Sequence, residues 1–384
     1  MPGKGNPSAG AGMDTFGTSS YDRSLARGAR AAVFDVLALR KDERVLIVTN
    51  PDPEVRQISM ALFDAALGVG AKPVLMFQKE KGQFDFAEDA VIKSIESGPE
   101  VALSLSTEKL GKDRWGLKQP YRGKRKYDHI YDYMYEEAKF RGFWSPGITK
   151  DMFSRTVPID YTRLRTDCAR IVTTLSEADS VRVTAPGGTD ITIGVRGRKH
   201  KPDDGDFRRP GRAGNLPSGE VYSSPVVGTS NGVIAFDGSI VLDVGEIVIK
   251  TPIVAEVEKG LVTSICGGNE ARKLEKTVNL GASKARKMGK SGELKPSVAE
   301  RYARNARSIG ELGIGLNRSA RIVANMLEDE KVYGTCHFAL GSNYDGDAEA
   351  LIHLDGLVKR PTITAVGRSG LEKRLMVDGK LVWD

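Results

Sequence analysis

Residues 44–78 contain two short apolar runs separated by a helical pattern, and this arrangement most limits what the chain can fold into. RVLIVTN (44–50) and KPVLMFQ (72–78) are rich in aliphatic side chains, as buried strands are. PEVRQISMALFDAALGVGA (53–71) lies between them, with apolar residues at helical spacing and glycines at its end. Because two strands joined by a crossover helix pair in parallel, the sequence predicts an α/β domain with a parallel sheet.

The pattern changes after about residue 170. Residues 180–199 alternate apolar and polar side chains around a Pro-Gly-Gly turn, which is typical of a β-hairpin. Short strands separated by Gly and Asp turns continue to the end of the sequence, interrupted by a helical pattern over 270–309. We therefore predict an α/β plus α+β chain with three parts: a flexible tail at 1–20, an N-terminal α/β domain with a parallel sheet at 21–168, and a C-terminal antiparallel β-rich domain at 169–384.

Composition argues against several classes of protein. No apolar run approaches the roughly 18 residues of a membrane span. The three cysteines are few and far apart, which indicates a reducing cytoplasm and no disulfide framework. The net charge of +7, from 57 basic and 50 acidic residues, is small, and no phosphate-binding loop or nucleic-acid-binding motif occurs. We expect a cytoplasmic protein that binds a peptide or a small molecule, and neither nucleic acid nor a membrane.

The stretch HFALGSNYDGDAEALIHLD (337–355) holds two of the four histidines. His353 and Asp355 are two residues apart, so on a strand they project from the same face. We expect His337 on an adjacent strand, with Tyr344 in the loop between them. Two imidazoles and a carboxylate at one place suit a divalent transition metal. The alternative is a sheet whose histidines are hydrogen-bonded within the protein.

Two glutamates in distant stretches extend this candidate site. Glu220 lies between a Gly-rich turn and a short strand in GNLPSGEVYSSP (214–225), and Glu311 lies in the apolar stretch SIGELGIGLN (308–317). A carboxylate in an apolar run is costly unless it is paired or bound to a cation. For Glu311, a helix cap or a buried ion pair is the alternative to metal ligation.

Together these motifs resemble the M29 family of metallo-aminopeptidases, of the aminopeptidase T and S type, most clearly over 180–384. NLPSGEVYSSP, IGELGIGLN, EDEKVYGTCHFALGSNY and IHLD occur in the family's order. The resemblance implies two divalent metal ions (zinc, cobalt or manganese) in the C-terminal domain, and a homodimer. The metal ligands that it implies are all present: Glu220, Glu311, His337, Tyr344, His353 and Asp355.

The activity implied by the resemblance is that of a metal-dependent aminopeptidase. Such an enzyme removes N-terminal residues from peptides with a water that bridges two metal ions. Tyr344 and Glu311 are the catalytic residues we predict. Tyr344 would donate a hydrogen bond to the developing oxyanion or touch a metal. A glutamate that holds no metal is a further candidate for the general base, and the sequence does not identify which one.

A different function on the same scaffold is the alternative. Residues 240–268 resemble the corresponding part of the 2,5-dihydroxypyridine dioxygenases, in which two histidines and one aspartate hold one iron. A hydrolase or deaminase of a small aromatic compound is a further option, and one Fe or Mn would then be the cofactor. The presence of both Glu220 and Glu311 favours the two-metal hydrolase. The span from His337 to His353 is short for the M29 family.

Other polar residues are interpreted as structural. Acidic residues of the predicted strands are expected to face solvent: Asp243, Glu246, Glu256 and Glu258. His129 and His200 lie in basic, polar stretches and are predicted at the surface, whereas Cys336 should point into the core, away from His337. Three arginines before Glu220 belong either to a solvated loop or to a binding site for a substrate carboxylate: Arg208, Arg209 and Arg212.

Overall fold

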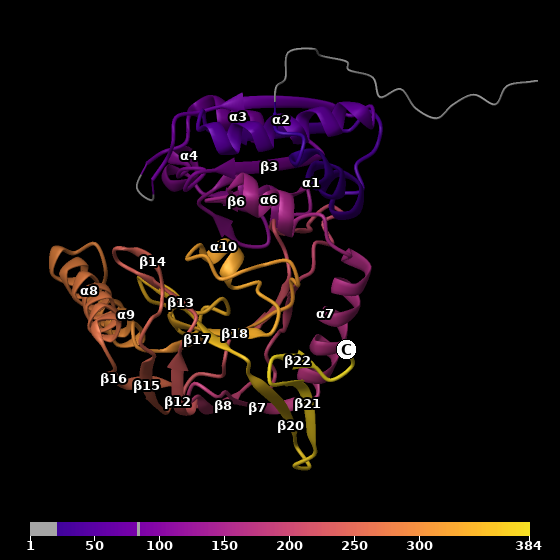
Figure 1. Cartoon of the computed structure of the whole chain (residues 1–384). Helices are drawn as coiled ribbons and strands as arrows, with labels where there is room; N and C mark the ends of the chain where they lie inside the picture. The colour runs from indigo at the N-terminus through magenta and orange to yellow at the C-terminus, as the bar shows by residue number, and fades with distance from the viewer. Residues whose placement is uncertain (1–20, 83–84) are drawn as a thin grey trace, which may run out of the picture.

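The computed structural model describes residues 21–82 and 85–384, so the tail predicted at 1–20 lies outside the described residues. An N-terminal part built on a parallel sheet lies above a β-rich part (Figure 1), and the helix α7 (Tyr161–Ser176) runs from one to the other. The predicted α/β plus α+β class is confirmed, with a parallel N-terminal sheet and antiparallel C-terminal sheets. No helix of the described residues is both long and apolar enough to cross a membrane.

The upper part contains a five-stranded parallel sheet in the order β10-β6-β3-β1-β2. Its strands are β1 (Arg44–Thr49), β2 (Lys72–Phe77), β3 (Val101–Ser106), β6 (Arg141–Pro146) and β10 (Ala213–Asn215). The crossover helix predicted between the first two strands is α2 (Pro53–Gly68). Asp52 caps it by accepting hydrogen bonds from the backbone N–H groups of Glu54 and Val55.

Helices cover both faces of this sheet, which is why its central strands read as continuous apolar runs. Val45 and Ile47 pack with the helices of one face, and Leu46 and Val48 pack with those of the other. The first face carries α1 (Leu25–Ala31), the π-helix η1 (Ala32–Val36), α2 and α6 (Lys150–Thr156). The second carries α3 (Asp89–Glu96) and α5 (Ile130–Glu136). In the sequence, α4 (Arg114–Lys118) and the hairpin of β4 (Tyr121–Arg122) and β5 (Lys126–Tyr127) come immediately before α5.

The lower part contains two antiparallel sheets. The eight-stranded sheet has the order β16-β15-β12-β8-β7-β20-β21-β22. Its strands are β7 (Ala178–Thr184), β8 (Asp190–Gly194), β12 (Asn231–Phe236), β15 (Ile253–Glu258), β16 (Leu261–Cys266), β20 (Thr362–Gly367), β21 (Glu372–Val377) and β22 (Lys380–Leu381). The predicted hairpin at 180–199 corresponds to β7 and β8, which pair around the expected turn.

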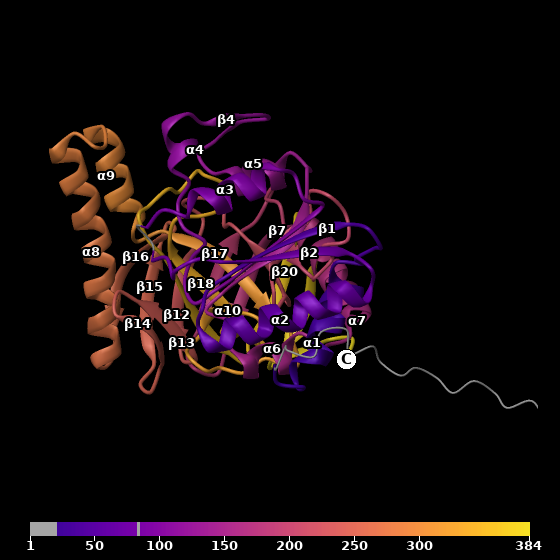
Figure 2. The ribbon, with the colours of Figure 1, turned by 90° about the horizontal axis from the view of Figure 1, so that it is seen from above.

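The seven-stranded sheet has the order β14-β13-β19-β18-β17-β11-β9. Its strands are β9 (Lys201–Asp203), β11 (Glu220–Ser223), β13 (Ser239–Leu242), β14 (Gly245–Val248), β17 (Ile309–Gly315), β18 (Thr335–Gly341) and β19 (His353–Lys359). The helical interruption predicted over 270–309 is the hairpin of α8 (Asn269–Ser291) and α9 (Pro296–Asn305), which stands at one side of the molecule (Figure 2). The short α10 (Met326–Asp329) precedes β18.

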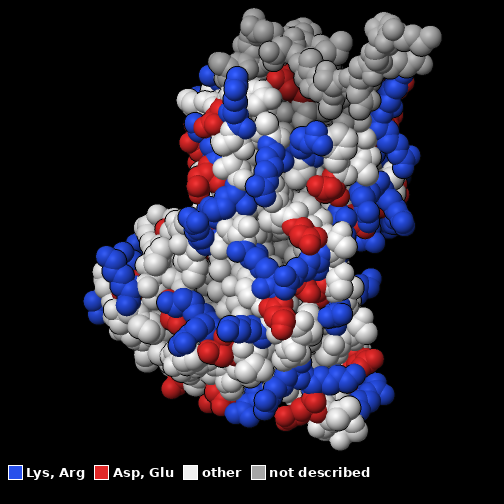
Figure 3. Space-filling model, turned by 45° about the vertical axis from the view of Figure 1, so that its right-hand side comes forward, with Lys and Arg blue, Asp and Glu red and all other residues white. Residues whose placement is uncertain are grey.

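Strand β10 connects the two parts of the molecule. It follows the first strands of the β-rich part in the sequence, yet it pairs with β6 of the parallel sheet, with Ala213 opposite Gly142. Glu220 begins the next strand, β11, only five residues after β10 ends. The candidate metal ligand Glu220 therefore lies close to the junction of the two parts. On the face shown in Figure 3, basic and acidic side chains are interspersed around the hollow between the parts.

A buried ion pair holds the start of β6 to the segment before β1. The Arg141 guanidinium, with its side chain 4% exposed, donates two hydrogen bonds to the Glu43 carboxylate at 2.9 and 2.7 Å and a third to the Leu37 carbonyl at 3.0 Å. Burial alone would raise the pKa of Glu43, but the hydrogen bonds from Arg141 outweigh it and lower that pKa. Removing the carboxylate would leave a buried cation without its partner.

We predict that Glu43→Gln lowers the free energy of unfolding by about 3 kcal/mol, the scale for breaking a buried ion pair. Urea unfolding followed by circular dichroism measures this change. The control is Glu96→Gln, which removes an exposed pair with Lys93 and should change the free energy by less than about 1 kcal/mol. Equal effects of the two substitutions would contradict this role of Glu43.

Candidate metal centre

The register of the seven-stranded sheet places five of the six predicted ligands on one face. On neighbouring antiparallel strands, directly paired residues project from the same face, as do residues two apart on one strand. The pairs that fix this face are Glu220 with Gly315, Gly313 with His337, Ala339 with Asp355, and Gly341 with His353. Glu311 lies two residues before Gly313 on β17 and therefore shares the face. The alternation argument made from H-x-D is confirmed for His353 and Asp355.

Small residues between the ligands leave room for their side chains. Gly313 is paired with His337, and a Cβ atom on Gly313 would lie 2.0 Å from both Cε1 and Nε2 of the imidazole. Gly313 of GELGIG is thus part of the site, because any larger side chain there would occupy the place of the His337 ring.

The five side chains form two overlapping groups. Nε2 of His337 lies 3.2 Å from Oε1 of Glu311 and 3.4 Å from Oε2 of Glu220. Nε2 of His353 lies 3.4 Å from Oε2 of Glu311 and 3.4 Å from Oδ1 of Asp355. Each group of three offers ligand atoms that all lie within 4.8 Å of one another, and Glu311 belongs to both.

The donor set fits a metal ion. Glu220, Glu311 and Asp355 are buried, and each has a carboxylate oxygen without a hydrogen-bond partner in the described structure. Such oxygens are costly to bury unless a cation binds them. The Nδ1 of His353 lies 2.8 Å from the Ser342 carbonyl, so its N–H donates there and leaves Nε2 free to bind a metal. The ligand assignment itself remains a prediction.

The charges of the group also favour binding of a cation. Burial alone would lower the pKa of both histidines, but the adjacent carboxylates raise that of His337 to about 9 and raise that of His353 as well. Burial raises the pKa of Glu220 to about 8. Burial alone would raise the pKa of Asp355, but the positive charge of His353 outweighs burial and lowers that pKa to about 2. Without a metal, therefore, protons on the imidazoles neutralise the carboxylates.

We predict that metal binding weakens as the pH falls. Because the pKa values of His337 and His353 are raised in the metal-free site, both imidazoles carry protons near neutral pH, and a metal must displace them. A lower pH makes that displacement harder. Dialysis of metal-loaded protein at pH 8, 7 and 6, followed by elemental analysis, should show decreasing metal content while circular dichroism reports an intact fold. Constant content over this range would contradict the assignment of His353 as a ligand.

Lys331 is a buried cation beside the first group, and sequence reasoning did not find it. Its side chain is fully buried, with Nζ at 2.6 Å from Oε1 of Glu220, 2.6 Å from Oε1 of Glu330 and 3.2 Å from Oδ2 of Asp203. Burial lowers the pKa of this amine, but the three carboxylates outweigh it and raise that pKa well above its ordinary value. One oxygen of Glu220 is therefore already bound to a permanent positive charge. In the sequence EDEKVYG, nothing distinguishes this buried lysine from a lysine exposed to solvent.

Tyr344 lies against the second group. Its ring centroid is 5.1 Å from that of His353 and 5.3 Å from that of Tyr222, and the residue is 56% exposed. Arg198 holds the loop that carries Tyr344 by ion pairs to Asp345 at 3.2 Å and Asp347 at 2.7 Å. The structure thus brings the predicted tyrosine next to a predicted ligand, with one face of its ring contacting the site.

The other polar residues give mixed outcomes. The four acidic strand residues are exposed as expected: Asp243, Glu246, Glu256 and Glu258. Cys336 is buried in the core, as alternation predicts. The surface prediction for His200 is wrong, because its Nδ1 lies 2.6 Å from the Ser223 hydroxyl and the ring is buried. His129 is half-buried and caps α5 by accepting a hydrogen bond from the Tyr131 N–H. The three arginines are exposed: Arg208, Arg209 and Arg212.

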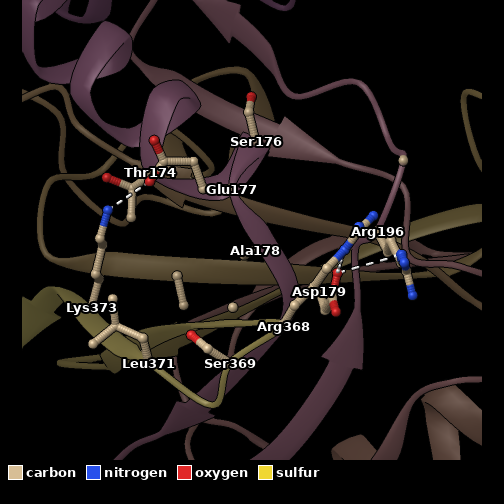
Figure 4. Close-up of a pocket in the computed structure, with 13 residues that line it drawn as sticks. Thr174, Ser176, Glu177, Ala178, Asp179, Arg196, Arg368, Ser369, Leu371 and Lys373 are labelled. Atoms are coloured by element: carbon tan, nitrogen blue, oxygen red, sulfur yellow. Dashed lines mark hydrogen bonds and ion pairs between the residues drawn. The ribbon is translucent and has the colours of Figure 1, made fainter.

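A hollow of about 590 Å³ lies elsewhere, between the end of α7 and strands β7, β20 and β21 (Figure 4). The charged residues that line it pair with one another: Lys373 with Glu177 at 2.6 Å, and Arg196 with Asp179 at 3.5 Å. None of the candidate metal ligands lines it. This hollow is therefore separate from the metal centre.

We predict that Gly313→Ala reduces metal affinity by about ten- to one-hundredfold, because the added methyl group displaces the His337 ring. Isothermal titration with Mn²⁺ measures the change. The control is Gly68→Ala on α2, where a Cβ atom meets nothing within 4 Å and alanine favours the helix. An unchanged affinity in Gly313→Ala would show that the His337 ring, which lies 3.2 Å from Glu311, does not influence metal binding.

Comparison with known proteins gives two kinds of match. A family model described as 2,5-dihydroxypyridine 5,6-dioxygenase matches residues 149–373, a range that includes every candidate ligand. A 2,5-dihydroxypyridine 5,6-dioxygenase of Pseudomonas putida is 29% identical over 130 residues, which cover 32% of this chain and 35% of that protein. The aligned part thus spans about a third of this curated relative.

Solved structures with the same fold include those of two proteins. The 2,5-dihydroxypyridine dioxygenase of Pseudomonas putida has a TM-score of 0.67 and 17% identity, over 95% of this chain and 99% of that one. AmpT from Thermus thermophilus has a TM-score of 0.62 and 16% identity, over 94% and 99%. At these identities the likeness shows the fold alone. The expected M29 relationship is thus supported by structure only, whereas the sequence matches point to the dioxygenase.

Proposed function

Because this chain belongs to the 2,5-dihydroxypyridine 5,6-dioxygenase family, we propose that it is a ring-cleaving dioxygenase of a small hydroxylated aromatic compound. Membership rests on the family match over 149–373, which is more than half of the chain. The β-rich part supports this proposal with a donor set for a metal ion, because two imidazoles and three carboxylates lie on one face of a sheet. This proposal replaces the aminopeptidase as the preferred function.

The observation that favours one metal ion is the position of Lys331. Its ammonium group is bound to Glu220 at 2.6 Å and occupies the centre of a cluster of three carboxylates. A second divalent cation at Glu220 would lie close to this fixed positive charge and be repelled by it. The group of Glu311, His353 and Asp355 has no such competitor among the described residues. We therefore propose that this group holds a single ion.

The proposed ion is iron, held by His353, Asp355 and Glu311, with His337 on the other side of the Glu311 carboxylate. A bound ferrous ion supplies the redox chemistry by which dioxygen opens a hydroxylated ring. Both oxygen atoms enter the product as one ring C–C bond breaks, so no external reductant is needed. Two residues of the chain have further roles in this proposal. The Ser342 carbonyl fixes the orientation of the His353 ring. Glu311 would accept the proton of a substrate hydroxyl.

A two-metal hydrolase is the second candidate, and one observation favours it. Glu311 belongs to both groups of three, as a carboxylate that bridges two ions would. Glu220 and His337 would then complete a second site, for zinc, cobalt or manganese, and the substrate would be a peptide. In this case Tyr344 would stabilise the oxyanion.

Metal content and oxygen uptake separate the two candidates. Protein purified without added metal should contain one iron per chain, and it should consume oxygen when given 2,5-dihydroxypyridine or a related hydroxylated ring. We predict that Glu311→Gln lowers both iron content and oxygen uptake by more than about tenfold. The control is Glu256→Gln, an exposed strand position, which should leave both unchanged. Two zinc, cobalt or manganese ions per chain, with release of N-terminal residues from short peptides, would refute the dioxygenase.

A further inference from the structure

We propose that Lys201 binds a carboxylate carried by the substrate, so that the substrate is a hydroxylated aromatic acid. This inference rests on the function proposed above for the position of the reacting ring. Its own support is the placement, surroundings and charge of Lys201.

The register of the sheet places Lys201 on the face of the metal ligands. In the pairing of β9 with β11, Asp203 lies opposite Glu220 and Lys201 lies opposite Tyr222. Because paired residues share a face, Lys201 and Tyr222 form the next row beyond Asp203 and Glu220. A substrate at the metal centre would therefore have Lys201 along one side.

Aromatic rings hold the Lys201 ammonium group, and no carboxylate does. Its Nζ lies 5.3 Å from the ring centroid of Tyr344 and 5.7 Å from that of Tyr222. The side chain is half-buried, and within the described residues it makes no ion pair with an acidic group. Cation–π contacts hold the ammonium in place without using its hydrogen-bond donors. The three N–H groups remain available to an anion.

The ring of Tyr344 connects this cation to the metal centre. It contacts Lys201 at 5.3 Å and the imidazole of His353 at 5.1 Å. Lys201 and His353 thus contact the same aromatic ring, so an aromatic compound bound beside His353 would have the ammonium group nearby. A carboxylate on that compound would form a charge-assisted hydrogen bond with Lys201, which fixes its orientation.

The surrounding charge explains why an anionic substrate needs this residue. Five carboxylates lie in the cluster and would repel an acid: Asp203, Glu220, Glu311, Glu330 and Asp355. Lys331 is already bound to three of them. Lys201 is not paired with a carboxylate among the described residues and contacts the ring of Tyr344 beside His353, so its charge is available to a ligand at this site.

The test is a binding comparison between 2,5-dihydroxybenzoate and 1,4-dihydroxybenzene, which differ by the carboxylate. Affinities are measured without oxygen by isothermal titration on iron-loaded protein. The wild type should bind the acid at least about tenfold more tightly, the scale of one charge-assisted hydrogen bond. Lys201→Met, which keeps the aliphatic stem, should abolish the difference, and Lys201→Arg should restore part of it. The control Lys199→Met changes an exposed lysine two residues away and should behave as the wild type.

Two results would overturn the inference: equal affinities of the wild type for the two compounds, or an unchanged preference in Lys201→Met. Circular dichroism of each variant verifies its fold. Because equilibrium binding needs no turnover, this comparison is independent of the dioxygenase test. If the protein consumes oxygen but shows no preference for the acid, the role of Lys201 is refuted and the proposed reaction is not. If the protein prefers the acid but consumes no oxygen, the proposed reaction is refuted and the role of Lys201 is not.

Discussion

The structure of the site depends on the cost of burying carboxylates side by side. Glu220, Glu311 and Asp355 are buried within reach of two imidazoles, and several of their oxygens have no hydrogen-bond partner among the described residues. Such a group is stable only if cations neutralise it. One cation, Lys331, is part of the chain and belongs to Glu220. The remaining negative charge lies at Glu311, His353 and Asp355, where we propose that an external cation binds.

This division of charge explains how one scaffold supports two kinds of chemistry. Among the five candidate ligands, Glu311 lies between the two imidazoles, where a carboxylate could bridge two ions. The fixed ammonium at Glu220 then reduces the need for a second ion. The sequence matches to a dioxygenase and the fold shared with AmpT are both consistent with this view, because the fold determines the positions of the ligands and not the number of metal ions.

Periodicity was sufficient to predict much of the fold and the shared face of two candidate ligands, whereas the full candidate set came from the resemblance to a family. The strand–helix–strand run at 44–78 predicted the parallel sheet because its apolar periods are unambiguous. H-x-D placed His353 and Asp355 on one face because the strand period is two. Contacts between distant segments were not predictable. Lys331 is 111 residues from Glu220, and its burial follows from the close approach of strands that no local pattern specifies. The roles of Lys201 and His200 depend on such contacts as well.

The number of metal ions in the site tests the central claim most directly. A crystal structure of protein purified without added metal, with anomalous data collected at the iron and zinc edges, locates and identifies each ion. We predict one iron peak at Glu311, His353 and Asp355, with the Lys331 ammonium still bound to Glu220. A second peak between Glu220 and His337, with Lys331 displaced, would contradict the claim that a lysine replaces the second ion.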